Sequence, residues 1–162
     1  MAFDLAPILP TVEPTLFAPV FVALFAAHQV GDHWVQSSCQ AATKARPGWA
    51  GRAACARHVA SLALTKVIAL AVVALVLGLD IHPAAVGLAL AVDAGSHYWA
   101  DRRTTLARLA QRVGKGEFYT LGAPRPGHDD APHLGTGAYA LDQSWHVAWL
   151  LVAALITTIG GA

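Results

Sequence analysis

Three pairs of histidine and aspartate, spaced four residues apart, are the part of this sequence that could do chemistry. They are His28 and Asp32, His97 and Asp101, and, in the opposite order, Asp142 and His146. Residues four apart lie one above the other on a helix, so both side chains of a pair can reach one point. Imidazole and carboxylate ligands together suit Zn, Fe or Mn, whereas softer metals favour thiolates. Because each pair stands at the end of a hydrophobic run, the pattern predicts a site built by several helices.

The elements that must position these pairs are four hydrophobic segments, at about residues 15–36, 58–79, 84–101 and 138–159. Charged residues make up 13% of the 162-residue chain and hydrophobic residues 56%, whereas about a quarter of a soluble domain is charged. A membrane-spanning helix needs about 20 mostly apolar residues. We therefore expect an all-α fold, an integral membrane four-helix antiparallel bundle that forms a single membrane domain over residues 1–162.

The stretch that follows the third segment has a different pattern. Leu106, Leu109 and Val113 fall on one side of a helix, and the arginines of this stretch are available to the other side. This pattern predicts an interfacial amphipathic helix at the membrane surface. Residues 114–137 are rich in glycine and proline and are expected to form a flexible loop. Its segment GHDDAPH, residues 127–133, is a candidate lid over the site.

The distribution of positive charge predicts the orientation of the bundle. Ten of the eleven Lys and Arg residues lie in the loops 37–57 and 102–137, and the remaining one, Lys66, lies within a span. The positive-inside rule places both loops in the cytoplasm and both termini outside. The expected location is the bacterial inner membrane, with multiple passes. The net charge of +1 does not suggest a nucleic-acid partner. The expected partner is the lipid bilayer, and formation of a homo-oligomer is compatible with the sequence.

This topology brings the polar residues to one end of the bundle. In an antiparallel bundle the ends of the first and third spans lie beside the starts of the second and fourth, so the pairs meet His58 at the cytoplasmic side. The predicted metal ligands are His28, Asp32, His58, His97, Asp101, Asp142 and His146. They exceed the four ligands of one tetrahedral zinc site, so we expect one or two divalent ions. Asp32, Asp101 and Asp142 are also the candidate catalytic carboxylates.

Polar residues inside a membrane need compensation. An ionised side chain at mid-depth costs roughly 2.5–3.5 kcal/mol, whereas a structural zinc site contributes roughly 10–16 kcal/mol at neutral pH. Lys66 and Asp93 lie deeper in their spans and are expected to form a buried ion pair. A single HxxxD pair is more often hydrogen-bonded polar packing, and Asp142 alone would suit a helix N-terminus. Three pairs that converge favour a metal or polar catalytic centre.

Four further polar residues could serve a substrate. Gln36 is a candidate for orienting the substrate or a water, and Lys44, Arg102 and Arg103 are candidates for holding a phosphate head group. The alternative reading of the three cations, as ordinary positive-inside anchors, is equally compatible with the sequence.

At these residues the chain resembles a family of small bacterial and phage membrane proteins known only as a domain of unknown function. The resemblance covers about residues 20–155 and rests on AHQVGDHWVQ (27–36), Lys44, His58, HYWAD (97–101) and DQSWH (142–146). The chain departs from the family pattern at His33, where an aromatic or aliphatic residue is common, and at Arg102-Arg103, where a lysine is. The resemblance implies a membrane-embedded four-helix unit of undefined role. A looser similarity links the chain to membrane-bound metal-dependent hydrolases.

Three functions are compatible with this pattern. The leading hypothesis is a metal-dependent membrane enzyme, most plausibly a hydrolase that acts on a lipid-linked or amphipathic substrate from the cytoplasmic leaflet. In such an enzyme the metal lowers the pKa of a bound water toward about 7. The second hypothesis is a protein that binds or transports divalent metal ions. The third is a structural membrane protein whose polar cluster only fixes helix packing.

Overall fold

A computed structural model describes residues 13–128, 130 and 135–159, and within these residues the chain is helical and has no β-strand. The elements are α1 (Pro14–Val30), the π-helical turn η1 (Gly31–Val35), α2 (Ser38–Thr43), α3 (Gly48–Leu77), α4 (Pro83–Asp101), α5 (Thr104–Arg112), α6 (Gly116–Thr120) and α7 (Gly137–Thr157). The predicted all-α class is therefore confirmed. Most of the candidate lid, residues 127–133, lies outside the described residues.

Three helical segments are long and apolar enough to cross a membrane, which indicates a membrane protein. They are Pro14–Val35, Gly48–Leu77 and Gly137–Thr157. The fourth predicted span, residues 84–101, falls on α4, a helix of 19 residues. This helix is not among the three, because Asp93, His97 and Asp101 lower its hydropathy. Two of the polar residues that lower the hydropathy of α4, His97 and Asp101, are predicted metal ligands, and the third, Asp93, is the predicted partner of Lys66.

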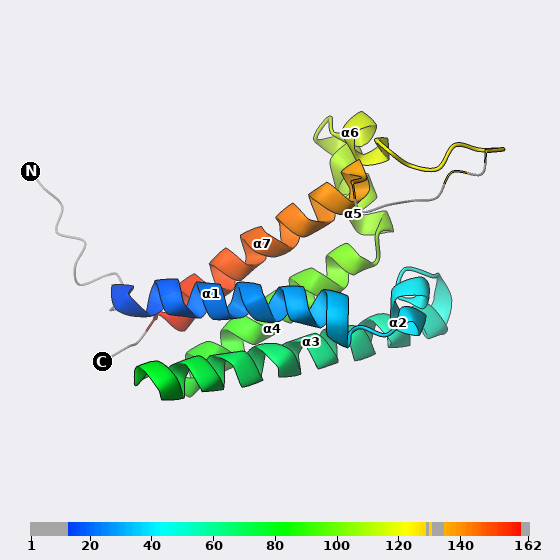
Figure 1. The fold of residues 1–162 in the computed structure, drawn as a ribbon. Helices are drawn as coiled ribbons and strands as arrows, with labels where there is room; N and C mark the ends of the chain where they lie inside the picture. Colours follow the sequence, from blue (N-terminus) through cyan, green and yellow to red (C-terminus); the bar gives the residue numbers. More distant parts are fainter. Residues whose placement is uncertain (1–12, 129, 131–134, 160–162) are drawn as a thin grey trace, which may run out of the picture.

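The four long helices α1, α3, α4 and α7 pack side by side, and each contacts two of the others. Helix α1 lies between α3 and α7, and α4 contacts the same two helices (Figure 1). Their apolar core consists of Val20, Ala23, Leu24, Leu70, Ala89, Leu150, Ala153 and Ala154. At one end, the backbone N–H of Glu13 donates to the carbonyl of Thr158 at 3.1 Å and ties the start of α1 to the end of α7.

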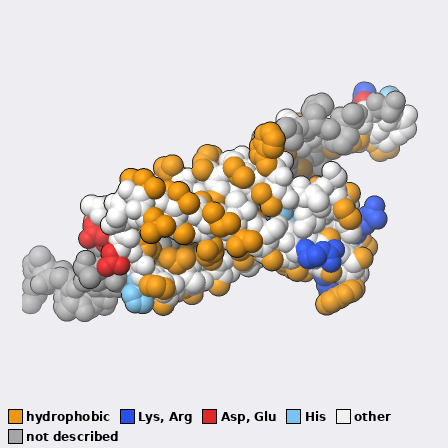
Figure 2. Space-filling model, turned by 60° about the horizontal axis from the view of Figure 1, so that its bottom comes forward, with side chains coloured by type: hydrophobic (Ala, Val, Ile, Leu, Met, Phe, Trp, Pro, Cys, Tyr) orange, Lys and Arg blue, Asp and Glu red, His pale blue; other side chains and the backbone are white. Residues whose placement is uncertain are grey.

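The outer surface of these helices is strongly apolar. In α3, only 17% of the most apolar stretch is buried inside the molecule, and Leu75 and Val76 are 84% and 76% exposed. Hydrophobic side chains cover the long body in Figure 2, whereas Lys and Arg gather toward one end and a group of carboxylates marks the other. An exposed apolar area of this extent requires an apolar environment or a partner.

Two predicted loops contain helices. Residues 37–57, expected as a polar loop, form α2 and the first turns of α3. Helix α2 begins with a capping box, in which the side chains of Ser37 and Gln40 bond each other's backbone N–H. Helix α3 begins after Pro47, ten residues before His58, and the hydropathy pattern misses this extension because it carries Arg52 and Arg57. The loop 114–137 likewise contains α6.

Candidate metal centre

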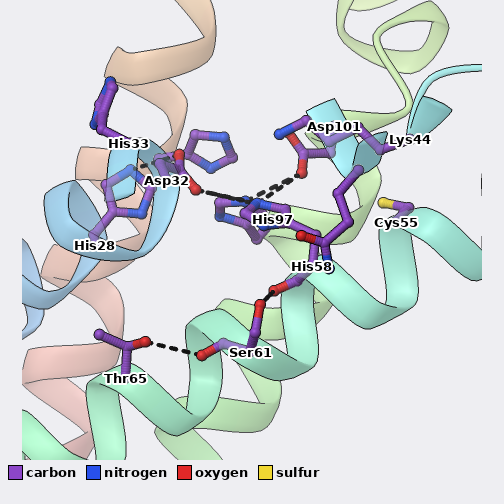
Figure 3. Close-up of polar contacts among 12 residues, drawn as sticks. His28, Asp32, His33, Lys44, Cys55, His58, Ser61, Thr65, His97 and Asp101 are labelled. Carbon is purple, nitrogen blue, oxygen red and sulfur yellow. Dashed lines mark hydrogen bonds and ion pairs between the residues drawn. The ribbon is translucent and has the colours of Figure 1, made fainter. Parts of the chain in front are cut away.

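The seven predicted ligands lie at one end of the packed helices. Each long helix contributes: His28 comes from α1 and Asp32 from η1 directly after it, His58 comes from α3, His97 and Asp101 come from α4, and Asp142 and His146 come from α7. The four histidines are 0–2% exposed. Figure 3 shows Asp32 and Asp101 on either side of the His97 ring, with His58 beside it.

The innermost group consists of His58, His97, Asp32 and Asp101. The Nε2 atoms of His58 and His97 are 3.1 Å apart. Oδ2 of Asp101 lies 3.4 Å from the first and 3.2 Å from the second. Oδ1 of Asp32 lies 3.1 Å and 3.6 Å from the same two nitrogens. The four atoms thus form two triangles that share the edge between the imidazole nitrogens.

These separations match the distances between ligand atoms around a small divalent ion. Zinc bonds of about 2.0–2.1 Å in a tetrahedral arrangement place neighbouring ligand atoms about 3.3–3.4 Å apart. All five separations in the two triangles fall between 3.1 and 3.6 Å. The donor set, two imidazoles and two carboxylates, is one that zinc, iron and manganese accept. Each of the two triangles could therefore present three ligand atoms to a divalent metal ion.

The hydrogen bonding of these atoms supports the same interpretation. In the described part of the chain, nine buried side-chain nitrogen or oxygen atoms lack a hydrogen-bond partner, and seven of them belong to the predicted ligands. A buried polar atom without a partner costs about 1–3 kcal/mol. Oδ1 of Asp32 and Oδ2 of Asp101 approach the imidazole nitrogens closely without the alignment of a hydrogen bond. Nε2 of His58 and Nε2 of His97 lie within hydrogen-bond distance of each other, so the two carboxylate oxygens are the atoms of this group that a cation would satisfy.

The other three ligands adjoin the innermost group. His28 Nε2 lies 3.5 Å from Oδ2 of Asp32, and His146 Nε2 lies 3.5 Å from Oδ2 of Asp142. The ring of His146 stacks on that of His97, with centroids 4.0 Å apart. Among the described residues, three groups bring ligand atoms within 4.8 Å of one another: His28, Asp32 and His97; His58, His97 and Asp101; and Asp101, Asp142 and His146. The first two groups have His97 in common, and the last two have Asp101 in common. This overlap is compatible with one ion or with two neighbouring ions.

Lys44 and Arg102 support the site through Asp101. Lys44 Nζ lies 2.8 Å from Oδ1 of Asp101, the carboxylate oxygen that faces away from the imidazoles. Arg102 donates to the backbone carbonyls of Lys44 and Arg46, which fixes the turn that carries Lys44 against the end of α4. Arg103 is exposed and has a positive φ of 53°. Two of the three cations predicted to hold a phosphate are therefore already bonded to protein groups.

The end of α1 is shaped by η1, the turn that carries Asp32. Its backbone closes with a bond from the N–H of Gln36 to the carbonyl of Gly31, and π-helical turns of this kind often occur at functional sites. A Cβ on Gly31 would lie 2.2 Å from Cδ1 of Leu62, so glycine lets this turn approach α3 closely. Gln36 is half-buried beyond the turn, and its amide nitrogen is buried without a partner.

Lys66 and Asp93 form an ion pair deeper in the structure. Lys66 Nζ and Oδ2 of Asp93 are 2.5 Å apart, and the two side chains are 0% and 6% exposed. They join α3 to α4 on the apolar-core side of the site, Lys66 about two turns from His58 and Asp93 about one turn from His97. The two side chains can therefore neutralise each other. The pair lies between the candidate site and the end of the molecule that carries the exposed carboxylates.

A family model for a protein of unknown function (DUF3307) matches residues 20–161. The chain belongs to the DUF3307 family. The match includes every candidate ligand, and the family description states no activity. No curated protein and no solved structure matches this DUF3307 chain.

The DUF3307 chain also has an apolar groove that the sequence analysis did not predict. It lies between α5 and α7 and is lined on the α7 side by Leu141, Trp145 and Ala148, among others. Their spacing of four and three residues is a signal for one helix face. It was not recognised because the neighbouring face of the same helix carries Asp142 and His146.

Proposed function

We propose that this protein is a metal-dependent membrane enzyme, a hydrolase that acts on a lipid-linked or amphipathic substrate at the cytoplasmic leaflet. The observation that carries the proposal is the innermost group of the site. His58, His97, Asp32 and Asp101 bring four buried donor atoms together, and each carboxylate oxygen lies 3.1–3.6 Å from both imidazole nitrogens. Without a cation, Oδ1 of Asp32 and Oδ2 of Asp101 would be buried without a hydrogen bond, which is costly.

In this proposal His58, His97, Asp32 and Asp101 hold one divalent ion, and His28, Asp142 and His146 complete its surroundings or hold a second. A bound ion of this type provides a water that ionises near neutral pH. Asp142 is the candidate proton acceptor, because its side chain is 25% exposed whereas those of Asp32 and Asp101 are 8% and 3% exposed. His146, 3.5 Å from Asp142, can share that proton.

The proposed setting is a four-helix antiparallel bundle in the bacterial inner membrane, with α4 shielded by α3 and α7 and with α5 at the membrane surface. The end rich in Lys and Arg would face the cytoplasm. The metal centre then lies at the depth of the inner-leaflet head groups, where the scissile bond of a lipid-linked substrate would lie. Both termini would lie outside.

The main test is to measure the metal content of the purified protein. The protein is purified without a metal-binding affinity tag, so that the tag contributes no metal. We expect one or two Zn, Fe or Mn ions per chain. His58→Ala and His97→Ala should each lose most of this metal while circular dichroism shows retained helices. His82→Asn is the matched control, because His82 is an exposed N-cap at the opposite end of α4. A wild-type protein without stoichiometric metal would contradict the proposal.

Metal transport is the second candidate, favoured by the acidic and imidazole groups that several helices share. A transported ion would have to pass Asp93, the next carboxylate toward the outer end, and Lys66 neutralises it. Proteoliposomes loaded with a metal-sensitive dye separate the two functions. Metal uptake that disappears in Asp93→Asn would favour transport. Metal binding without uptake would favour the hydrolase.

A further inference from the structure

The groove between α5 and α7 is a cavity of about 230 Å³ next to the candidate metal centre. Its lining is Leu106, Leu109, Ala110, Val113, Lys115, Leu141, Ser144, Trp145 and Ala148. All but Lys115 and Ser144 are apolar or aromatic. At about 30 Å³ for a group the size of a water molecule, this volume has room for about eight such groups, for example the methylene groups of a lipid chain. A groove of this size and composition suits one hydrocarbon chain.

The groove and the site share one stretch of α7. Leu141 and Trp145 line the groove, and the residues that follow them, Asp142 and His146, belong to the site. The ring of Trp145 stacks on Trp99 of α4 at 4.8 Å, next to the stack of His146 on His97. A molecule that fills the groove would therefore contact Leu141 and Trp145, the residues that directly precede Asp142 and His146 on α7.

The segment 103–120, which forms one side of the groove, carries four cations and one carboxylate, Glu117. Lys115 lines it, and Arg103 stands exposed at the start of α5. Burial raises the pKa of the Tyr119 hydroxyl. The charge of Arg103 lowers this pKa and the charge of Asp142 raises it, because both groups lie near the hydroxyl. Arg108 and Arg112 occupy the exposed side of α5. An apolar groove with cations at its border is complementary to a lipid that carries a phosphate.

We propose that this groove binds one hydrocarbon chain of a phosphate-bearing membrane lipid and directs its head group toward Asp142 and His146. Lys115 and Arg103 would contact the phosphate, and α5 would form the outer wall of the chain site. The inference rests on the proposed function in naming this lipid as the substrate of the metal centre. Binding of the lipid itself does not require the metal.

The test is photo-crosslinking in phosphatidylcholine nanodiscs with a phosphatidic acid probe that carries a diazirine in one acyl chain. We expect crosslinked peptides to fall in residues 106–113 and 141–148. Ala148→Phe fills the groove from an exposed position and should lower crosslinking at least fivefold. If this variant fails to fold, Ser144→Phe serves the same purpose. Ala140→Phe, exposed on α7 but not part of the groove lining, is the matched control.

Two further measurements separate the groove from the metal centre. Lys115→Gln should lower crosslinking of the phosphatidic acid probe about threefold more than that of a diacylglycerol probe. The metal-deficient His97→Ala should retain crosslinking. Crosslinks spread over the apolar surface of α3, without a response to Ala148→Phe, would overturn the groove while the metal proposal stands.

Discussion

At the scale of single residues, Asp101 is the group that connects the site to its surroundings. Its two carboxylate oxygens have different neighbours: Oδ2 faces His58 and His97, and Oδ1 faces Lys44. Residues that hold a metal ligand from behind fix its orientation, and their loss typically lowers metal affinity 10–100-fold. Lys44 would occupy this position in the proposed metal centre, so its contribution can be measured separately from that of the proposed ligands.

We predict that Lys44→Met weakens metal binding about 10–100-fold without abolishing it. The reason is that Asp101 loses the cation that holds its carboxylate in place. A competition titration with a metal chelator measures the affinity. Arg46→Met is the matched control, because Arg46 lies in the same turn but contributes only its backbone carbonyl to the contacts around the site. Equal affinities for both variants would show that Lys44 does not orient Asp101.

Lys66 and Asp93 give a second prediction at this scale. Removing one partner of a buried ion pair leaves an uncompensated charge and costs about 3–5 kcal/mol. Lys66→Met should therefore lower the free energy of unfolding by about this amount in mixed micelles. The double variant Lys66→Met/Asp93→Leu should regain most of it, because two apolar groups replace both charges. If the double variant is no more stable than Lys66→Met, the uncompensated charge of Asp93 is not the cause of the lost stability.

At the scale of elements, the start of α3 and the turn before it depend on a close approach. A Cβ on Gly51 would lie 1.9 Å from the carbonyl oxygen of Arg46. The same carbonyl accepts a hydrogen bond from Arg102 at the end of α4. The absence of a side chain at residue 51 thus lets three segments meet, and this meeting places Lys44 on Asp101.

Gly51→Ala is expected to lower the free energy of unfolding by about 1–3 kcal/mol and to weaken metal binding in the same titration. The clash with the backbone at Arg46 outweighs the usual gain of alanine over glycine in a helix, about 0.8–1.0 kcal/mol. Gly95→Ala provides the comparison, since no atom lies within 4 Å of its added Cβ. The interpretation fails if both alanines have the same effect.

At the scale of the whole molecule, charge and hydropathy divide along the long axis. Apolar side chains cover the body, and Lys and Arg gather toward the end that holds the site (Figure 2). In a membrane this division would fix the orientation, with the positive end toward the cytoplasm. The two cysteines provide a way to test it, because Cys39 is exposed near the positive end and Cys55 is buried.

A membrane-impermeant maleimide should label Cys39 in inverted inner-membrane vesicles but not in intact cells with a permeabilised outer membrane. The proposed topology places the loop that carries α2 in the cytoplasm, and only inverted vesicles expose that side to the reagent. In the variant Cys39→Ser/Asp80→Cys the label should react from the other side, because Asp80 is exposed at the opposite end of the molecule. Labelling of Cys39 in intact cells would reverse the proposed topology.

The sequence by itself determined the helical class, the apolar segments and the end of the molecule at which the polar residues meet. These features depend on local periodicity, hydropathy and the alternation of chain direction, which can be read from neighbouring residues. His28, His58, His97 and His146 could therefore be assigned to one end of the molecule before any contact was known.

Only the tertiary structure decided which atoms face one another. The contact of Lys44 with Asp101, the close approach at Gly51 and the groove between α5 and α7 join segments far apart in the chain. Such contacts depend on how helices rotate and approach each other, and side-chain spacing within one helix does not specify this. The π-helical turn at Asp32 belongs with them, because at Gly31 it lies against Leu62 of α3.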